Sequence, residues 1–332
     1  MLFTTQDACP SGPYWLREML RPILHQGVTA VSCREEPRPG CDLLGRVSIF
    51  IHNSYMGVLH SDRIMQMPDK VSAETLRKNA QLSDLACLIR KDVFNQYRYR
   101  RNFAEDLDLG LRLIRDGHRL ALLSGVHVIH SHTRPAIYHF KRAIVDVNAL
   151  NEMLPGYVGG SCPERYTINR TMTAYCVIKL YVQAAREYRL AGDGRDEWNC
   201  FREWTLREID SDLTAVRRMR PKERKKLIES ECVFFDADYH KVILEMLNIL
   251  KGDFAVEATT VNEIAHYLVN ILDDYFACAE EPFSASIVDE ICILAEKLTG
   301  LFAGNLVGTY STLNKNENSE LNRLVKRYAQ GI

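Results

Sequence analysis

The character of the sequence changes near residue 134, and this change limits the folds that the chain can adopt. Before residue 134, short apolar runs alternate with loops rich in glycine and proline. Such alternation is typical of an α/β unit built on a mixed sheet. From Pro135 onward, apolar residues recur at helical spacing almost without interruption. The sequence therefore predicts two domains, an α/β domain over 1–134 and an α-helical domain over 135–332.

Each domain can be divided into expected elements. In the α/β domain we expect few helices, and the apolar runs predict strands at 27–32, 119–123 and 126–130 and helices at 13–24 and 106–116. In the second domain, long amphipathic runs predict helices at 135–154, 163–191, 196–219, 221–250, 259–279, 285–303 and 318–329. Turn-forming sequences such as A-G-D-G at 191–194 separate these runs.

Length and composition are those of an ordinary globular protein. The chain has 332 residues, 46% of them apolar and 26% charged, and a net charge of −1, which gives no indication of nucleic acid binding. No run of about 18 consecutive apolar residues is present, and the first residues do not resemble a signal peptide, so we expect no transmembrane helix. Ten cysteines without a C-x-x-C pair are expected to be reduced thiols in a cytoplasmic protein.

The segment at 103–117, F-A-E-D-L-D-L-G-L-R-L-I-R-D-G, places Glu105 and Asp106 at the expected start of a short helix. A stripe of apolar residues and a closing glycine follow (Leu107, Leu111, Ile114 and Gly117). Acidic side chains at a helix start are stabilised by the helix dipole, so a simple capping role is one interpretation. The other is catalytic, because a carboxylate can take a proton from an attacking hydroxyl.

Two further segments contain side chains of types that can bind metal ions. Asp7 precedes a Pro/Gly turn, so we expect it at the end of a strand, where its carboxylate could hold a divalent cation. The run V-I-H-S-H places His130 and His132 where a strand ends and the chain reverses. Together with the acids at 105 and 106, these residues would supply the groups that a metal-assisted group transfer needs. In such a reaction the cation neutralises a diphosphate leaving group.

The order of three motifs carries a family resemblance: T-Q-D-A at 5–8, F-A-E-D-L-D-L-G-L-R-L at 103–113 and V-I-H-S-H-T-R-P-A at 128–136. They resemble the family 2 glycosyltransferases of the GT-A fold, in particular the bacterial rhamnosyltransferase-like branch that builds cell-surface polysaccharides. The resemblance covers about residues 1–150. It implies a hexosyltransferase that moves a sugar such as rhamnose, with inversion, from a nucleotide-diphosphate donor to a hydroxyl of a glycan or lipid-linked acceptor. It also implies Mg²⁺ or Mn²⁺ as cofactor.

The resemblance also implies residue roles. Asp106 corresponds to the catalytic base, with Glu105 beside it. Asp7 corresponds to the metal-binding carboxylate, and His130 or His132 to the histidine on the metal side. The family resemblance gives no roles to the helical half of the chain.

Basic residues near these motifs could bind the donor phosphates. Arg101 belongs to an arginine- and tyrosine-rich stretch just before the acidic pair, where arginine could meet a diphosphate or simply lie in a solvated loop. Arg134 and Lys141 flank the start of the helical half and could close over phosphates. The run R-R-M-R-P-K-E-R-K-K at 217–226 is either a surface helix junction or a contact with anionic membrane lipid, and nucleic acid is the least favoured partner.

Two departures from the family pattern affect these expectations. Thr5 occupies the first acidic position of the D-x-D element, which removes one carboxylate from the donor side. A GT-A domain begins with βαβ units of about 30 residues each, whereas here the element lies at 5–7. We therefore expect an N-terminally truncated, incomplete GT-A-like sheet with an unpaired edge, and a chain that is impaired as a transferase by itself. We expect this chain in the cytoplasm or at the inner face of the membrane.

Two alternatives to a transferase are left open by the sequence. The chain could be a non-catalytic helical interaction or scaffold protein that carries a degenerate transferase segment. It could also be a zinc hydrolase, because strand-borne His-x-His pairs can chelate zinc and four histidines lie close together in sequence (His127, His130, His132 and His139).

Overall fold

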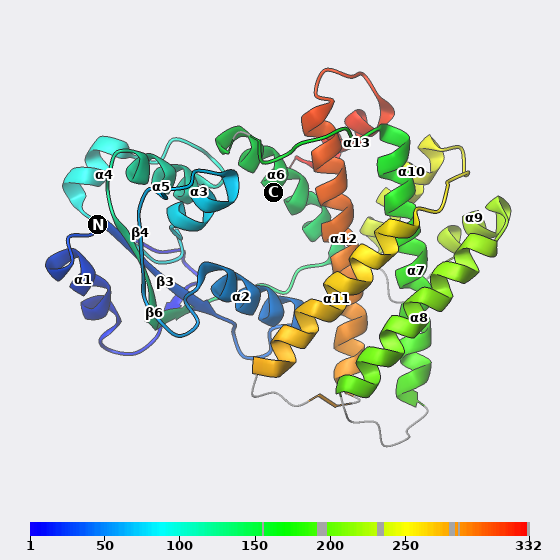
Figure 1. Cartoon of the computed structure of the whole chain (residues 1–332), viewed down its shortest axis with the longest axis horizontal. Coiled ribbons are helices and arrows are strands. Elements are labelled where there is room, and N and C mark those ends of the chain that lie inside the picture. The colour runs from blue at the N-terminus through cyan, green and yellow to red at the C-terminus, as the bar shows by residue number, and fades with distance from the viewer. Residues whose placement is uncertain (155, 191–197, 231–235, 279–282, 285, 331–332) are drawn as a thin grey trace. The chain divides into compact units, whose positions relative to one another are not determined.

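The computed structural model describes residues 1–154, 156–190, 198–230, 236–278, 283–284 and 286–330. The chain forms two compact units (Figure 1). Unit 1 consists of Met1–Thr133 and Ala149–Tyr157, and unit 2 consists of Arg134–Asn148 and Val158–Ile332. Unit 1 contains strands and helices, whereas the described part of unit 2 is helical, so the predicted order of an α/β part followed by an α-helical part is confirmed.

Unit 1 is built on a mixed sheet of six strands in the order β1-β5-β3-β6-β2, with β4 paired to β6 beside this path. The strands are β1 (Leu2–Phe3), β2 (Cys9–Pro10), β3 (Ala30–Glu36), β4 (Arg63–Met65), β5 (Cys87–Ile89) and β6 (Leu120–Ile129). β3 and β6 run parallel, and the other pairs in the described sheet are antiparallel. The carboxyl ends of β3 and β6 therefore meet at the same edge of the sheet.

The prediction of two strands at 119–123 and 126–130 is wrong, because β6 is one strand. The register of β3 against β6 shifts between Cys33 and Arg34, where additional residues of β6 form a bulge. A bulge bends a strand without ending it, so the polar Ser-Gly pair inside β6 is accommodated within the sheet.

The strand predicted at 27–32 lies further along the chain, at Ala30–Glu36. Its last residues are charged, which hid them from a prediction based on apolar runs. These charges are paired in the sheet. Arg34 lies 2.7 Å from a carboxylate oxygen of Glu36, whose other oxygen lies 3.0 Å from Nε2 of His127.

Helices cover both faces of the sheet. They are α1 (Trp15–His25), α2 (Leu43–Met56), α3 (Ala73–Ala80), α4 (Lys91–Tyr97) and α5 (Glu105–Arg115). The predictions of α1 and α5 are confirmed to within two residues, whereas α2, α3 and α4 were not predicted. Alternate strand residues enter two apolar clusters. Ala30 and Leu120 pack with α3 to α5, whereas Val31 and Ala121 pack with α1.

Helix α5, which carries the acidic pair, is held tightly against α3. The predicted apolar stripe is buried (Leu107, Leu111 and Ile114). A Cβ atom at Gly110 would overlap the carbonyl oxygen of Ala80, so glycine allows the two helices to approach closely. After the helix, Gly117 adopts a φ of 81°, which glycine tolerates without strain. The predicted stop of this helix is therefore confirmed.

The described helices of unit 2 follow most of the predicted runs. They are α6 (Ala136–Met153, which ends in unit 1), α7 (Glu164–Leu190), α8 (Trp198–Arg218), α9 (Pro221–Glu229), α10 (Ala237–Ile249), α11 (Ala258–Cys278), α12 (Ile287–Leu313) and α13 (Glu320–Tyr328). The single helix predicted at 221–250 is two helices, α9 and α10, and residues 231–235 between them lie outside the described residues. Helix α12 continues ten residues past the predicted end at 303.

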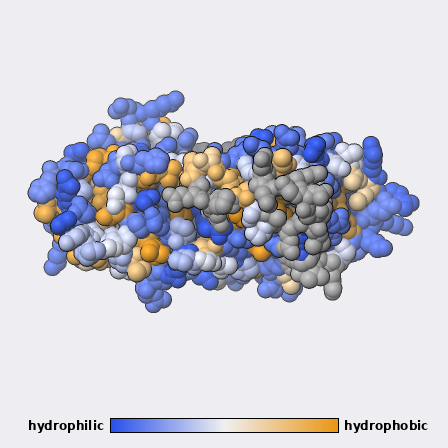
Figure 2. Space-filling model, turned by 90° about the horizontal axis from the view of Figure 1, so that it is seen from below, coloured by the Kyte–Doolittle hydropathy of each residue, from blue (hydrophilic) through white to orange (hydrophobic). Residues whose placement is uncertain are grey.

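Within the described residues, α12 is the one helix long and apolar enough to span a membrane by length and composition. Its most apolar window is 78% buried inside the structure, as expected for the core helix of a bundle. Three glycines (Gly300, Gly304 and Gly308) line the side of α12 that faces α6. A Cβ atom at Gly304 would overlap the carbonyl oxygen of Phe140, so the backbones of α6 and α12 are in direct contact. On the face shown in Figure 2, hydrophobic residues lie in separate areas between hydrophilic ones.

Candidate functional site

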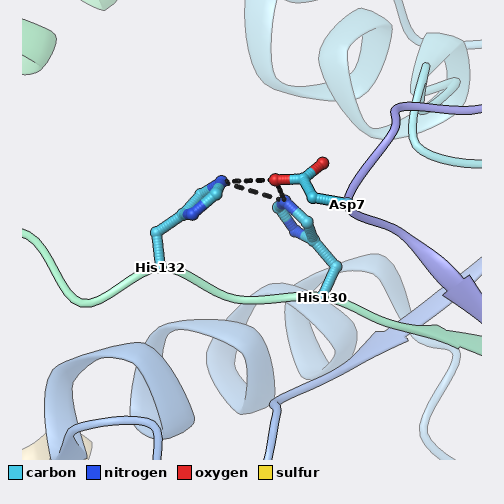
Figure 3. A group of neighbouring side chains, drawn as sticks. All are labelled: Asp7, His130 and His132. Carbon is cyan, nitrogen blue, oxygen red and sulfur yellow. Dashed lines mark hydrogen bonds and ion pairs between the residues drawn. The ribbon is translucent and has the colours of Figure 1, made fainter.

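The three predicted metal ligands, Asp7, His130 and His132, lie together in unit 1 (Figure 3). The sheet register explains why residues so far apart in sequence meet. β2 pairs antiparallel with the end of β6, and Cys9 lies opposite Ile129. Asp7 comes just before β2 and His130 just after β6, so the pairing brings the carboxylate to the two imidazoles.

The donor atoms of these three side chains form a small triangle. Nε2 of His132 lies 3.2 Å from Oδ2 of Asp7, and Nε2 of His130 lies 3.6 Å from the same oxygen. The two Nε2 atoms are 3.2 Å apart. Two ligands at about 2.0–2.1 Å from a tetrahedral ion are about 3.3 Å apart, so the triangle has a size that one cation could fill. Hydrogen bonds among a carboxylate and two imidazoles have similar distances.

The charges around the triangle favour an ionised carboxylate. The Thr5 hydroxyl, and then His130 and His132, hold the pKa of Asp7 below its ordinary value. The carboxylate of Glu35, with Oε2 3.5 Å from Nδ1 of His130, raises the pKa of that imidazole, and Asp7 raises it further. A carboxylate on the far nitrogen of a metal-binding histidine is a common arrangement, because it fixes the orientation of the ring.

The chemistry of the donor set distinguishes between the two predicted ions. Mg²⁺ prefers oxygen ligands in a near-octahedral shell, whereas two of the three donors here are imidazole nitrogens. Imidazole suits first-row transition ions better. The residues present therefore fit Mn²⁺ better than Mg²⁺.

The second group of predicted residues, Glu105 and Asp106, begins helix α5. The residue before them, Ala104, has a φ of 50°, an uncommon left-handed conformation for alanine. Oδ1 of Asp106 accepts a hydrogen bond of 2.7 Å from the backbone N–H of Leu107. Burial, and then the charges of Asp84 and Glu105, raise the pKa of Asp106 to about 7. A carboxyl group with such a pKa can exchange a proton near neutral pH, as a general base must.

Two acidic residues that we did not predict connect these groups. The pKa of Asp84 is raised by burial and then by Glu105, with a smaller contribution from Glu35. Glu35 also interacts with His130. Glu35 is therefore an electrostatic neighbour of both the triangle, through His130, and Asp84, and Asp84 in turn raises the pKa of Asp106.

The position of Glu35 in the sequence carries a signal for its role. Glu35 lies at the carboxyl end of β3, beside the carboxyl end of β6 that precedes His130. In sheets of this kind, ligands are bound outside the carboxyl ends of parallel strands. Asp84 has no comparable signal, because it precedes the short strand β5 and its position depends on the fold of the whole unit.

Two of the three predicted phosphate-binding residues have partners in their own surroundings. Arg101 forms an ion pair with Glu152, so its charge already has a partner. Arg134 lies over the ring of Tyr138, 5.3 Å from its centre, and Lys141 is half-buried on α6. Arg134 and Lys141 belong to unit 2, whereas the triangle and the acids of α5 belong to unit 1.

His127 and His139, the other two histidines of the zinc alternative, are not part of this group of metal-type side chains. Nε2 of His127 lies 3.0 Å from Glu36, and the ring of His139 packs edge-on against Tyr138. Across the described residues, the triangle of Asp7 with two histidines is the one group of three or more metal-type side chains.

No family model, curated protein or solved structure matches this chain. The geometry of the two groups in unit 1 is therefore the basis for inferring the function. The motif resemblance adds an expectation about the reaction that these groups would serve.

Proposed function

We propose that this chain is an inverting glycosyltransferase of the GT-A type. It would transfer a hexose such as rhamnose from a nucleotide-diphosphate donor to a hydroxyl of a surface-glycan acceptor on the cytoplasmic side of the membrane. The observation that carries this proposal is the half-buried Asp106, with a pKa of about 7, in the same unit as a carboxylate–imidazole triangle. Transfer from a diphosphate needs both a proton acceptor and neutralisation of the leaving group.

The proposed step is a single displacement. The acceptor oxygen attacks the anomeric carbon while Asp106 accepts the hydroxyl proton. The bond from that carbon to the diphosphate oxygen breaks, and the nucleoside diphosphate departs with the bonding electrons. Burial, and then Asp84 and Glu105, keep the pKa of Asp106 high. When bound by the triangle, a divalent cation would supply positive charge to the diphosphate oxygens.

The proposal is tested by measuring nucleotide-sugar binding to the whole chain with and without Mn²⁺, together with release of nucleoside diphosphate in the presence of glycan acceptors. We expect Mn²⁺-dependent donor binding in the wild type and in Asp106→Asn. Transfer by Asp106→Asn should be slower by about 10²–10⁴-fold, the usual contribution of a general base. Asp116→Asn, at the exposed end of the same helix, is the matched control and should transfer normally.

The outcomes separate the parts of the proposal. Equal transfer by Asp106→Asn and the wild type would refute the role of Asp106 as base. If the wild type binds no nucleotide-sugar under any condition, the transferase proposal is wrong and a non-catalytic interaction protein becomes the better explanation.

A further inference from the structure

We propose that a basic surface at the junction of α8 and α9 docks on membranes that contain anionic lipid. This α8–α9 basic surface consists of six exposed side chains: Arg217, Arg218, Arg220, Lys222, Lys225 and Lys226. It belongs to unit 2, and its role is independent of the sugar chemistry proposed for unit 1.

The local fold leaves these charged side chains exposed at one helix junction. Helix α8 ends at Arg218, and α9 begins two residues after Met219 with a proline in its first turn. The inner side of α9 is anchored by the buried Ile228 and by Arg224, whose guanidinium lies 5.2 Å from the centre of the Phe254 ring. The lysines at 222, 225 and 226 recur at i, i+3 and i+4, so they share the outer face of the helix.

Most of the positive charge on this surface is not compensated. Residues 217–229 contain seven Lys and Arg and two Glu. Glu223 lies 2.6 Å from Arg220, and Glu229 lies 3.5 Å from Lys225, so each glutamate forms an ion pair with a basic side chain of this surface. The other four exposed cations have no ion pair with any residue that the structure describes (Arg217, Arg218, Lys222 and Lys226).

This uncompensated charge opposes the stability of the helix. Lys222 and Lys226 lie four residues apart on α9, a spacing at which like charges repel. An anionic partner would remove this repulsion, whereas a purely solvated face would need no such concentration of charge.

A second element adds to the surface. Lys251 is exposed in the loop that follows α10. A Cβ atom at the next residue, Gly252, would lie 2.9 Å from Cδ of Lys225, so this loop packs against α9. The acid nearby, Asp253, faces Arg224 at 3.9 Å. The positive charge therefore comes from segments that are separate in sequence and adjacent in the fold.

The chemistry of the surface favours lipid headgroups over nucleic acid. None of the exposed large hydrophobic side chains in the described chain lies within 217–229, so no aromatic ring is available there to stack on bases. The chain as a whole has a net charge of −1, unlike typical nucleic-acid-binding domains. A membrane with anionic lipid attracts basic side chains by charge density alone, and each adds about fivefold in affinity.

The test is co-sedimentation of the full chain with lipid vesicles. Phosphatidylcholine vesicles are compared with vesicles in which part of that lipid is replaced by phosphatidylglycerol, at low and at high salt. We expect binding to the anionic vesicles at low salt, loss of this binding at high salt because salt screens exposed charges, and no binding to neutral vesicles. The variant R217Q/R218Q/K222Q/K226Q should bind several hundredfold more weakly, from about fivefold for each side chain.

The matched control changes the same net charge elsewhere in unit 2. It replaces four exposed basic residues by glutamine (Arg165, Arg207, Lys241 and Lys315). Circular dichroism is used to check that both variants fold. The comparison of lipids and salts with the wild type does not depend on any variant.

Three results would overturn the proposal. One is equal binding of the wild type to neutral and anionic vesicles. Another is equal loss of binding in the basic-surface variant and the control. The third is binding of a DNA duplex without binding of anionic vesicles, which would assign the surface to nucleic acid instead.

Discussion

Replacing Asp106 by asparagine should stabilise unit 1 while it removes the proposed catalytic base. The pKa of Asp106 is raised from an ordinary 3.8 to about 7 by burial and then by Asp84 and Glu105. A pKa that rises from 3.8 to about 7 corresponds to about 4 kcal/mol. This is an upper value for the free energy by which the charge on Asp106 opposes folding at neutral pH, because the side chain is half-buried.

The sign of this effect gives a pH dependence. The folded state binds the proton of Asp106 more tightly than the unfolded state does, so the penalty is absent below about pH 4, grows between about pH 4 and pH 7, and is complete above that range. Asparagine cannot ionise, and its oxygen can still accept the bond from the N–H of Leu107. We expect Asp106→Asn to change the unfolding free energy little at pH 4 and to raise it by about 2–4 kcal/mol at pH 8.

The assay is urea unfolding at several pH values, followed by ¹⁹F NMR of protein labelled with 5-fluorotryptophan. Trp15 is 5% exposed and is the one tryptophan of unit 1, so its resonance reports the unfolding of that unit separately from Trp198 and Trp204. If Asp106→Asn raises the unfolding free energy equally at pH 4 and pH 8, or lowers it at pH 8, the charge on Asp106 does not oppose folding.

Asp108 provides a control of the opposite sign on the same helix. It accepts hydrogen bonds from Arg100 at 3.2 Å and from Arg112 at 2.9 Å. Burial raises the pKa of Asp108, but these two arginines outweigh burial and hold it below its ordinary value. Asp108→Asn should therefore lower the unfolding free energy by about 1–3 kcal/mol at neutral pH, and this effect should shrink as the pH falls through the folded pKa.

Two further predictions concern the triangle and the core of unit 2. Glu35→Gln should weaken Mn²⁺ binding, measured by electron paramagnetic resonance, by about tenfold because it frees the ring of His130. Glu36→Gln, which affects the neighbouring histidine outside the triangle, should change Mn²⁺ binding little, and equal effects would contradict this role for Glu35. Gly304→Ala should lower the unfolding free energy by about 1–3 kcal/mol through overlap with α6, despite the better helix propensity of alanine. Gly159→Ala, where a Cβ meets nothing within 4 Å, should have little effect on thermal unfolding, and equal changes would argue against close packing of α6 and α12.

The sequence predicted helices with long, regular apolar spacing well, and three helices of unit 1 were missed, α2, α3 and α4. Helix α2 contains a run of alternating β-branched residues (Val47, Ile49 and Ile51) and a glycine, so this part of its sequence does not indicate a helix. Capping residues mark both ends of α2. The carboxylate of Asp42 accepts a hydrogen bond of 2.9 Å from the backbone N–H of Gly45, and Gly57 ends the helix with a φ of 69°. These capping residues are visible in the sequence and would have predicted the helix.

The candidate site was predictable in part for a similar reason. Asp7, Asp106 and His130 belong to short motifs whose order is visible in the sequence. Glu35 and Asp84 become neighbours of these residues only through the parallel pairing of β3 with β6 and the antiparallel pairing of β5 with β3. Such strand pairings depend on the packing of the whole unit, and a local sequence pattern does not predict them.

The glycine-lined contact between α6 and α12 has a consequence for how the protein is made. The contact joins distant parts of the chain, and a hydrogen bond of 2.6 Å from Thr312 to Asn148 near its end spans 164 residues. A ribosome completes α6 and α7 long before it reaches α12, so the apolar faces that α12 covers stay open during most of synthesis of unit 2. Until α12 arrives, a nascent chain of this protein should be a substrate for holding chaperones, and gene products that stop before α12 should aggregate rather than fold.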